Sequence, residues 1–415
     1  MVGRKGSRNL NRSTPGPMRI AIVNWTSRKV GGAEAYLDLV IPELVDDGHQ
    51  VAFFHELDGP SGRGQIALEK TPTWCVAEIG AESALAELSR WSPQVIYAHG
   101  LLDPELEAAT LKVAPAAFFA HSYYGTCISG SKTWSNTTVR PCNRVFGPLC
   151  LLHYFPHRCG GLNPFTMLSE YRRQGLRLEL LHRYRYVLTA SEHMRAEFTK
   201  HGLSARLLPL FVAASTSLTD RIPSSSQWRI LFLGRMDRLK GGVSLLEALP
   251  IISQTLDRSL HVTFAGDGPD RQRWESRGLE LKSTSARLSF EFPGWVSGNA
   301  LNSLLLDSDL LVIPSLWPEP FGLSGPQAGL CGVPAAAFDV GGISDWLKHG
   351  VNGYLAPADP PTSEGLAEAV IKCLRDPEVH VRLKQGAAEM AQRFNMQNHM
   401  SVLTGLLERL VSQSS

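Results

Sequence analysis

Residues 229–242, RILFLGRMDRLKGG, decide how the fold of this chain is interpreted. A short apolar run ends at a Gly-Arg pair, a polar loop follows, and helical spacing begins at residue 243. Such a run is typical of a buried strand. Arg235 and Lys240 are both placed to reach one anion across the loop, and the next helix adds N–H donors and its positive dipole end. The stretch predicts a strand, an anion-binding loop and a helix; two solvated cations in a surface turn are the alternative.

The same alternation extends outward from this stretch in both directions. Further apolar runs occupy residues 18–25, 49–56, 94–100, 114–122 and 184–190 before it and 260–266, 287–294 and 308–314 after it. Helical segments separate these runs, and Ser191 is placed to cap the helix that follows the run at 184–190. Strands that alternate with helices predict parallel, doubly wound sheets. We therefore expect an α/β protein with two Rossmann-like parallel-sheet domains facing a central cleft.

A Ser-, Thr- and Pro-rich stretch divides the pattern into two halves and sets the expected domain boundaries. The prediction is a disordered tail at 1–17, an N-terminal domain at 18–212 with a Cys-rich insertion at 122–165, a linker at 213–227, a C-terminal domain at 228–390, and a C-terminal helix at 391–415 that packs back on the N-terminal domain.

Composition excludes several classes of protein. The chain has 415 residues, 43% of them hydrophobic, which excludes a disordered chain. Its 41 basic and 39 acidic side chains nearly balance, so no electrostatic footprint for nucleic acid is present. No apolar run reaches the ~18 residues of a membrane span, and no apolar segment follows the basic N-terminus as in a secretory signal. We expect a cytoplasmic protein, with peripheral membrane contact left open.

A second informative loop is PSLWPEPFGLSGPQAGLCGVP, residues 314–334. Glu319 follows a predicted strand, and the backbone amides of Phe321, Gly322 and Leu323 come shortly before a helix expected to begin at 326. A carboxylate beside free amides suits the recognition of hydroxyl and phosphate groups together. The alternative is a loop carboxylate that only caps the helix.

These motifs in combination resemble glycosyltransferase family 4. The resemblance rests on GR-x4-K-G, GDGP (266–269), PGWVS (293–297), PEPFGL and DVGGISDWLKHGVNGYL (339–355), with GGAE (31–34) and the strand-end AHG and AHS also similar. It implies the GT-B fold and a retaining glycosyltransferase that moves a sugar from a UDP- or GDP-linked donor to an acceptor hydroxyl. It implies no cofactor for catalysis, and it leaves the acceptor unidentified.

The resemblance also implies roles for individual residues. Arg235 and Lys240 would hold the donor diphosphate, Glu319 would contact the transferred sugar, and His121 would lie beside the reacting sugar. A hydrogen-bonded strand-end histidine is the alternative for His121. The donor-binding residues implied are Gly31, Gly32, His99, Gly266, Gly268, Gly294, Trp295, Val296, Phe321, Gly322, Leu323 and Gln327. Gln327 stands where the family often has a second glutamate; its amide still bonds to hydroxyls but carries no charge.

The insertion at 122–165 directly follows His121 and holds four of the chain's seven cysteines: Cys127, Cys142, Cys150 and Cys159. A structural zinc ion, unlinked thiols and disulfides all remain open for them. Zinc suits a reducing compartment, although the spacing contains no CxxC pair. We expect the insertion to influence the choice of acceptor.

Other functions remain in competition with glycosyl transfer. A sugar-nucleotide epimerase of the same fold and a non-catalytic sugar-nucleotide-binding protein both fit the donor motifs, and a phosphorylase shares the two-lobed fold. A dehydrogenase fits less well, because GDGPDR (266–271) has Arg271 where a dinucleotide fingerprint has its third glycine.

Overall fold

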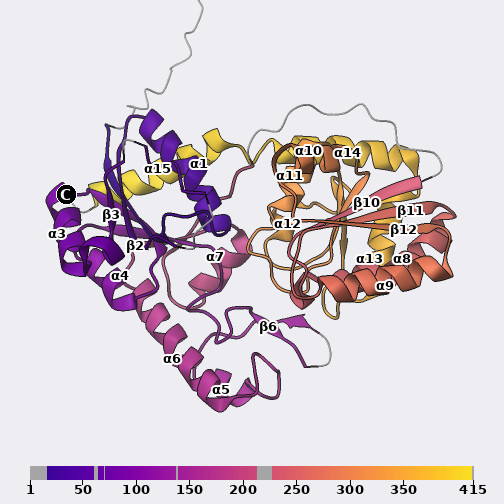
Figure 1. The fold of residues 1–415 in the computed structure, drawn as a ribbon, viewed down its shortest axis with the longest axis horizontal. Coiled ribbons are helices and arrows are strands. Elements are labelled where there is room, and N and C mark those ends of the chain that lie inside the picture. Colours follow the sequence, from indigo (N-terminus) through magenta and orange to yellow (C-terminus); the bar gives the residue numbers. More distant parts are fainter. Residues whose placement is uncertain (1–15, 60–63, 70, 137–138, 213–226, 414–415) are drawn as a thin grey trace, which may run out of the picture. The chain divides into compact units, whose positions relative to one another are not determined.

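The computed structural model describes residues 16–59, 64–69, 71–136, 139–212 and 227–413 (Figure 1). Residues 1–15 of the predicted tail and 213–226 of the predicted linker lie outside the described residues. The chain divides into two compact units: the described parts of Met1–Ala117 and Thr404–Ser415 form one, and Phe118–Leu403 form the other. The C-terminal residues thus group with the N-terminal sheet, and the boundary at 117 falls inside a strand.

The first unit contains elements that alternate as the sequence predicts. They are β1 (Arg19–Thr26), α1 (Gly32–Asp46), β2 (Gln50–Leu57), β3 (Thr73–Cys75), α2 (Val76–Ile79), α3 (Ala81–Trp91), β4 (Val95–Gly100), α4 (Pro104–Thr110) and the start of β5 (Ala116–Ala120). The second unit continues with β6 (Thr133–Trp134), β7 (Arg140–Pro141), α5 (Leu149–His153), α6 (Pro164–Leu181), β8 (Tyr186–Thr189), α7 (Glu192–Thr199) and β9 (Ala205–Leu207).

The remaining elements follow the predicted linker. They are β10 (Gln227–Leu233), the short 3₁₀ helix η1 (Arg238–Lys240), α8 (Gly242–Leu256), β11 (Ser259–Ala265), α9 (Arg271–Thr284), β12 (Leu288–Gly294), α10 (Gly298–Leu306), β13 (Leu310–Ile313), α11 (Ser324–Leu330), β14 (Ala335–Phe338), α12 (Ile343–Trp346), β15 (Gly353–Ala356), α13 (Ser363–Leu374), α14 (Pro377–Ala391) and α15 (Met396–Ser412).

The two large sheets are doubly wound. Over the described residues, the first has seven strands in the order β3-β2-β1-β4-β5-β8-β9, and the second has six in the order β12-β11-β10-β13-β14-β15. Neighbouring strands pair in parallel, as in β1 with β4 and β10 with β13. The strand order reverses between β1 and β4 in one sheet and between β10 and β13 in the other. Ligands of open α/β sheets bind outside the carboxyl ends of the strands at such a switch point.

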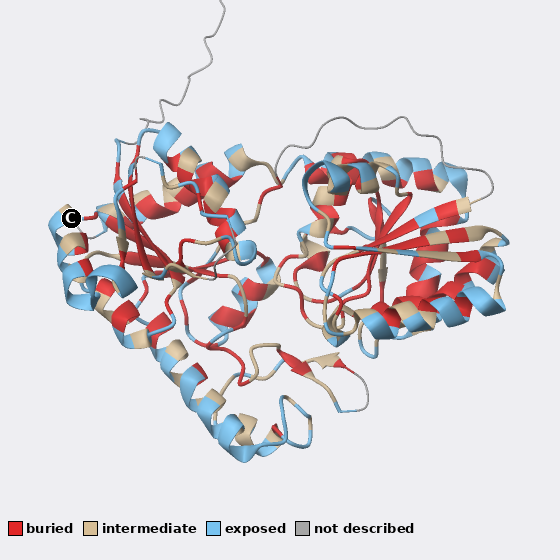
Figure 2. Ribbon diagram, in the orientation of Figure 1, coloured by how far each residue is buried: buried red, intermediate tan, exposed pale blue. Residues whose placement is uncertain are grey.

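Helices cover both faces of the second sheet, with α8, α9 and α13 on one face and α10, α11 and α14 on the other (Figure 1). The strands are largely buried between these layers (Figure 2), because apolar side chains point to both faces of a parallel sheet. The prediction of an α/β protein with two parallel sheets is therefore confirmed. The placement of the two units about a central cleft stays a prediction.

Two strands of the second sheet did not stand out in the sequence. β14 reads AAAF and β15 reads GYLA, and alanine and glycine have little intrinsic preference for strands. All four residues of β14 are buried between β13 and β15. Their small side chains fit a central position that only the assembled sheet defines.

The Cys-rich insertion is anchored by a buried ion pair that was not predicted. Lys132, at only 1% exposure, places its Nζ 2.8 Å from Glu197 Oε2 on α7, and it donates to the backbone carbonyl of Arg144 at 2.7 Å. Lys200 also pairs with Glu197. Burial works to raise the pKa of Glu197, but the two ammonium groups outweigh it and hold that pKa below its usual range. A single lysine thus ties the insertion to the sheet-covering helix.

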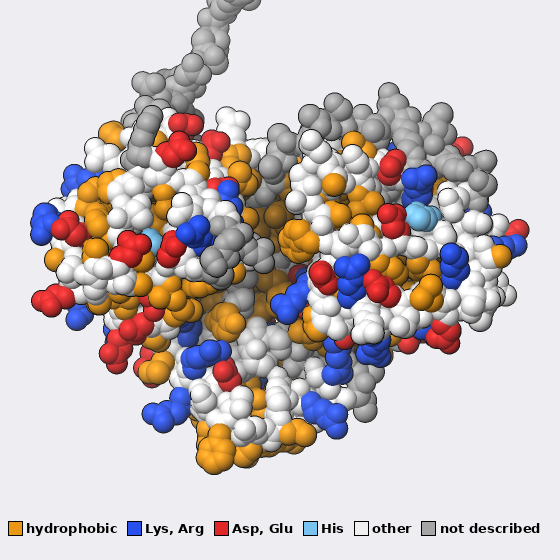
Figure 3. All heavy atoms as spheres, in the orientation of Figure 1, with side chains coloured by type: hydrophobic (Ala, Val, Ile, Leu, Met, Phe, Trp, Pro, Cys, Tyr) orange, Lys and Arg blue, Asp and Glu red, His pale blue; other side chains and the backbone are white. Residues whose placement is uncertain are grey.

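The far end of the insertion has a different character. From α5 through α6 the chain exposes large apolar side chains beside arginines, visible as orange and blue atoms where these helices meet (Figure 3). Among the described residues, every helix is too short or too polar to cross a bilayer.

We predict that Lys132→Met lowers the free energy of unfolding by roughly 3 kcal/mol, because it leaves a buried carboxylate with one partner fewer. Urea unfolding measures the loss. The matched control is Lys200→Met, whose side chain is 42% exposed and whose loss should be well under half as large.

The pH dependence gives an independent check on the same pair. The pKa of Glu197 is lower in the folded chain than its usual value of 4.5. Its contribution to stability is therefore full above pH 4.5 and is lost as the pH falls through the folded-state pKa. The stability difference between wild type and Lys132→Met should shrink in acid. A pH-independent difference, or none, would contradict the anchor.

Candidate functional site

The switch point of the second sheet brings together two of the residues selected from the sequence. Lys240 ends η1 in the loop after β10, and Glu319 lies in the loop after β13. Lys240 Nζ donates to Glu319 Oε1 at 2.6 Å. The ammonium also lies 5.5 Å from the centre of the Trp317 ring. Because β10 and β13 are neighbours, their carboxyl ends place both loops at one edge of the sheet.

Glu319 is held by its own loop as well. Its Oε1 atom also accepts hydrogen bonds from Ser315 Oγ and from Trp317 Nε1, the latter at 2.9 Å. The residue is 5% exposed, so these bonds replace water around the carboxylate. Within the described part of the chain, the Oε2 atom accepts no hydrogen bond. The pair therefore presents one carboxylate oxygen that a ligand hydroxyl can use.

The loop after β10 is shaped by Asp237 and by a close backbone contact. Asp237 Oδ1 accepts the amides of Leu239 and Lys240. Gly241 has φ of +68°, and a Cβ there would lie 1.8 Å from the carbonyl oxygen of Pro314. Only glycine permits this approach of the two loops. Arg235, the other predicted cation, is 70% exposed, and its ion pair with Asp237 at 3.6 Å is a weak surface contact.

The segment 321–323 precedes α11, which begins at Ser324 and not at 326 as expected. Among the described residues, the amides of Gly322 and Leu323 donate no hydrogen bond within the chain. Phe321 is buried, with its ring 5.2 Å from Phe394, so only its backbone can meet a ligand. Gln327 is partly exposed on α11.

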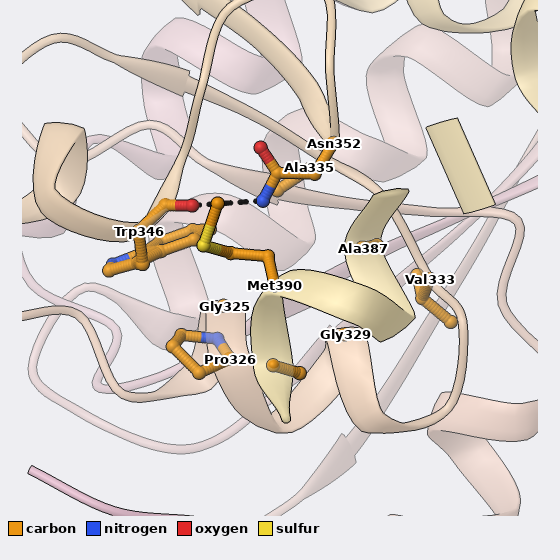
Figure 4. Close-up of a pocket in the computed structure, with 10 residues that line it drawn as sticks. Gly325, Pro326, Gly329, Val333, Ala335, Trp346, Asn352, Ala387 and Met390 are labelled. Carbon is orange, nitrogen blue, oxygen red and sulfur yellow. Dashed lines mark hydrogen bonds between the residues drawn. The ribbon is translucent and has the colours of Figure 1, made fainter. Parts of the chain in front are cut away.

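Trp346 donates a hydrogen bond to this segment and accepts one from Asn352, and Figure 4 shows the latter contact. Its Nε1 donates to the Phe321 carbonyl at 2.7 Å, and Asn352 Nδ2 donates to the Trp346 carbonyl at 2.9 Å. A Cβ on Gly325 would lie 1.9 Å from the indole ring, so position 325 admits no side chain. The cavity beside Trp346 has a volume of only about 10 Å³, room for at most one water. It belongs to the packing of α11 and is not a ligand site.

Pro326 fits α11 without cost. It is the third residue of the helix, where the backbone amide has no partner within the helix. The proline beside Gln327 therefore leaves the helix intact.

The loops after β11 and β12 lie against the loop after β10. The amide of Met236 donates to the Asp267 carbonyl at 2.9 Å, and the amide of Asp270 returns a bond to the Met236 carbonyl at 3.0 Å. Gly268 is part of this turn. Gly266 donates to the Gly294 carbonyl at 2.8 Å.

Beyond Gly294 the chain is open to solvent. Trp295 is 75% exposed and Val296 partly so. Arg271, in the third-glycine position of the rejected dinucleotide fingerprint, donates to the Phe292 carbonyl at 2.9 Å. Its role is to hold the end of β12, which supports the rejection.

A pocket of about 420 Å³ borders the same loop but is a separate feature. Its lining includes Arg238 and Arg273 together with the carboxylates of Glu247 and Glu364, so it does not concentrate positive charge. Arg235, Lys240 and Glu319 do not line it.

In the first unit, Gly31 and Gly32 begin α1 at the switch point after β1. Both are exposed, and Glu34 Oε2 accepts the Gly31 amide at 2.8 Å. A Cβ on Gly32 would meet nothing within 4 Å. Packing within the described residues therefore does not require glycine at position 32.

His99 ends β4, on the other side of the same switch point. It is 8% exposed, and its ring lies 4.5 Å from the Tyr97 ring and 5.6 Å from the Tyr36 ring. The Tyr36 and Tyr97 hydroxyls share a hydrogen bond of 2.7 Å. An aromatic cluster thus fixes the orientation of His99.

His121 follows β5 directly, in the second unit. Its ring lies 4.7 Å from the Phe119 ring, and burial lowers its pKa to about 4. The imidazole is therefore neutral near pH 7 and cannot act as a cation toward a phosphate. A neutral ring nitrogen still positions a hydroxyl by hydrogen bonding.

Tyr123 is a site residue that the sequence analysis missed. It is fully buried, its ring lies 6.4 Å from the Trp317 ring, and its hydroxyl has no hydrogen-bond partner among the described residues. Burial raises the pKa of Tyr123 well above its usual value, and the nearby carboxylates of Glu197, Glu319 and Asp345 raise it further. The signal available was its position two residues after His121. Ser315 and Trp317, close before Glu319, were missed in the same way.

The cysteines of the insertion lie within electrostatic reach of one another. Burial, followed by the neighbouring Cys127, Cys142 and Cys150, raises the pKa of Cys159 to about 12. The four cysteines of the insertion fall in the described residues and are free thiols. In the same residues, no three His, Cys, Asp or Glu side chains are arranged to hold a metal ion. The structure thus offers no preformed donor set, and the zinc site stays a prediction.

Part of the chain matches a known family. Residues 220–390 match the family model described as "Glycosyl transferases group 1". An uncharacterized glycosyltransferase of Methanocaldococcus jannaschii is 34% identical over 148 residues, 35% of this chain and 36% of that protein. Phosphatidyl-myo-inositol mannosyltransferase of Mycobacterium leprae is 28% identical over 189 residues, 45% of this chain and 48% of that protein. The chain spans less than half the length of these relatives.

Solved structures resemble nearly the whole chain. HepE of Anabaena, in complex with UDP and glucose, has a TM-score of 0.65 at 18% identity and covers 94% of this chain and 100% of that one. Sucrose-phosphate synthase from Thermosynechococcus elongatus has a TM-score of 0.68 at 20% identity and covers 96% and 100%. At these identities the likeness concerns the fold, and the fold is GT-B.

We predict that the His121 ring does not titrate between about pH 8 and pH 5. Its pKa in the folded state, about 4, lies below the usual histidine value of 6.5. Protonation therefore favours the unfolded chain, and this residue's share of stability falls as the pH drops below 6.5 toward 4. Histidine NMR signals followed against pH, with His121→Gln for assignment, measure this. A titration midpoint near the usual histidine value of 6.5 would contradict the burial of the ring.

For the four insertion cysteines, the sequence leaves a zinc ion, unlinked thiols and disulfides open, and we test the zinc site. Elemental analysis of the purified protein together with thiol titration tests it. Zinc that is lost on changing both Cys142 and Cys159 to serine would support the site. If the purified protein contains no metal and all its thiols react after unfolding, the zinc site is refuted.

Proposed function

We propose that this chain is a retaining glycosyltransferase of family 4, which moves a hexosyl group from a nucleotide-sugar donor to an acceptor hydroxyl. The match of residues 220–390 to group 1 glycosyl transferases supports glycosyl transfer. The fold it shares with HepE, crystallised with UDP and glucose, supports a UDP-linked donor.

One observation carries the proposal: the Lys240–Glu319 pair at the switch point of the second sheet. It puts an ammonium, a carboxylate with an open Oε2 and the free amides of Gly322 and Leu323 on adjoining loops. A nucleotide sugar has the complementary groups in the same order, a diphosphate next to a ring of hydroxyls. The cation and amides suit the diphosphate, and the carboxylate suits the sugar.

Departure of the nucleoside diphosphate places negative charge on the phosphate oxygens. Lys240, with Arg235 from the same loop, is positioned to stabilise that charge as it develops, without reorganisation at the moment of reaction. Arg235 is exposed and only weakly paired, so it can turn toward the diphosphate. The ammonium of Lys240 would exchange part of its contact with Glu319 for the phosphate.

Retention follows if the acceptor attacks the face from which the diphosphate leaves, with a departing phosphate oxygen taking the acceptor proton. In this scheme His121 need not be a base. Its neutral ring would position the sugar, consistent with a pKa of about 4. Gly31 and Gly32 would let the backbone of their loop approach the donor.

We predict that Arg235→Ala and Lys240→Ala each lower the rate of transfer by on the order of 10²-fold, because each removes a charge that stabilises the leaving group. Arg238→Ala is the matched control. It removes a cation from the same loop whose guanidinium contacts the Ser135 carbonyl at 3.3 Å, and its rate should stay near that of wild type.

The donor is first found by a thermal-shift screen of UDP- and GDP-linked sugars, since a ligand that binds only the folded state raises its apparent stability. NMR of the product then reports whether the anomeric configuration is retained. Inverted product would refute the retaining mechanism alone. An altered sugar without transfer indicates an epimerase, and tight binding with neither transfer nor hydrolysis indicates a binding protein. Near-wild-type rates for both alanine variants would refute the roles of Arg235 and Lys240.

A further inference from the structure

The end of the insertion and the helix that follows it present a surface that the proposed function does not use. We call it the α5–α6 tip and define it as residues 149–176. Its most exposed apolar side chains are Leu152 at 71%, Leu162 at 77% and Phe165 at 81%. Leu149 is also largely exposed. Large apolar side chains this exposed, in a group, mark an interaction surface.

On α6 the exposed apolar residues form one stripe. Phe165, Leu168, Arg172 and Leu176 are spaced by three, four and four residues, which places them on one side of the helix, and all are exposed. The opposite side holds the buried Gln174, whose Oε1 accepts the Gly125 amide at 2.7 Å. The helix thus packs inward through Gln174, Leu180 and Leu181, and it also leaves an apolar stripe open to solvent, where a surface helix is ordinarily polar.

The charge around the tip is strongly positive. The tip itself, residues 149–176, contains Arg158, Arg172 and Arg173 against Glu170, for a formal charge of +2. With the flanking residues 140–148 and 177–185 the formal charge is +6, from eight arginines and two glutamates. The whole chain carries only +2, so the rest of it is net negative. Figure 3 shows blue arginine and lysine side chains flanking the orange tip.

Together these features select one occupant. A second copy of this chain would bring the same positive tip against this one, +2 against +2, so charge does not favour self-association through the tip. A surface that is negative and also accepts protruding leucine and phenylalanine side chains is an anionic phospholipid bilayer. Apolar side chains enter the boundary of the acyl chains, while arginines reach the phosphates of the headgroups.

We propose that the α5–α6 tip docks the protein on anionic phospholipid membranes. Leu149, Leu152, Leu162 and Phe165 are the residues that insert, and Arg158 and Arg172 are the residues that bind lipid phosphates. Membrane binding of this kind is peripheral and reversible, because it depends on a few inserted side chains and on charges that salt screens. It does not depend on the proposed glycosyl transfer, so the two can fail separately.

Co-sedimentation with vesicles tests the proposal. Wild-type protein should sediment with vesicles of equal parts phosphatidylcholine and phosphatidylglycerol, should not sediment with phosphatidylcholine alone, and should be released by high salt. Leu162→Ser with Phe165→Ser should lower partitioning by on the order of 10-fold or more. Arg158→Glu with Arg172→Glu should lower it by roughly 5-fold for each charge removed, and further for each charge reversed.

The matched controls carry the same changes elsewhere. Leu279→Ser on α9 alters a leucine of 69% exposure, and Arg382→Glu on α14 alters an exposed arginine. Both should bind vesicles as wild type does, and all variants should keep the wild-type thermal unfolding. The proposal is overturned if wild type does not bind anionic vesicles, if the tip variants bind unchanged, or if the controls lose as much. It is also overturned if sedimentation velocity finds a dimer that the tip variants abolish.

Discussion

The contact between Lys240 and Glu319 is the interaction on which the rest of the candidate site depends. It joins two residues that are 79 positions apart in the sequence. Their loops follow β10 and β13, the neighbouring strands between which the strand order of the second sheet reverses. Because the carboxylate is nearly buried, it must be matched by donors, and Ser315 and Trp317 supply them. Removing the Lys240 ammonium would leave the buried Glu319 carboxylate with one partner fewer. The same two residues therefore stabilise the loops and are proposed to bind the ligand.

Much of the fold follows from short-range patterns. Apolar runs such as 229–235 predicted the main strands, because residues buried on both faces of a parallel sheet are uniformly apolar. The alanine-rich strand β14 was not predicted, because it is stabilised by burial between its neighbours and not by the strand preference of its own residues. In the site, Arg235, Lys240 and Glu319 were selected from their loops. Tyr123 and Trp317 were not, because their proximity depends on how distant segments fold together.

The insertion also combines features that the sequence predicts with features that depend on the folded structure. Its cysteines drew attention to a metal staple, yet the structure anchors it through Lys132 and Glu197, which are 65 residues apart. Lysine is rarely buried, so nothing in the local sequence marks it as a core residue. The exposed stripe of α6 was equally hidden, because helical spacing of apolar residues is the same whether the stripe faces a core or the solvent. The burial of Gln174, Leu180 and Leu181 shows which side faces inward.

The close contacts at Gly241 and Gly325 limit how this site can be re-engineered. At each, any side chain would collide with a neighbour in the candidate site, Pro314 in one case and Trp346 in the other. Random libraries that vary these two positions would therefore yield mostly misfolded protein. Trp295 is largely and Gln327 partly open to solvent, so changing them disturbs less buried packing. Directed evolution of donor preference should therefore hold the two glycines constant and diversify those two positions.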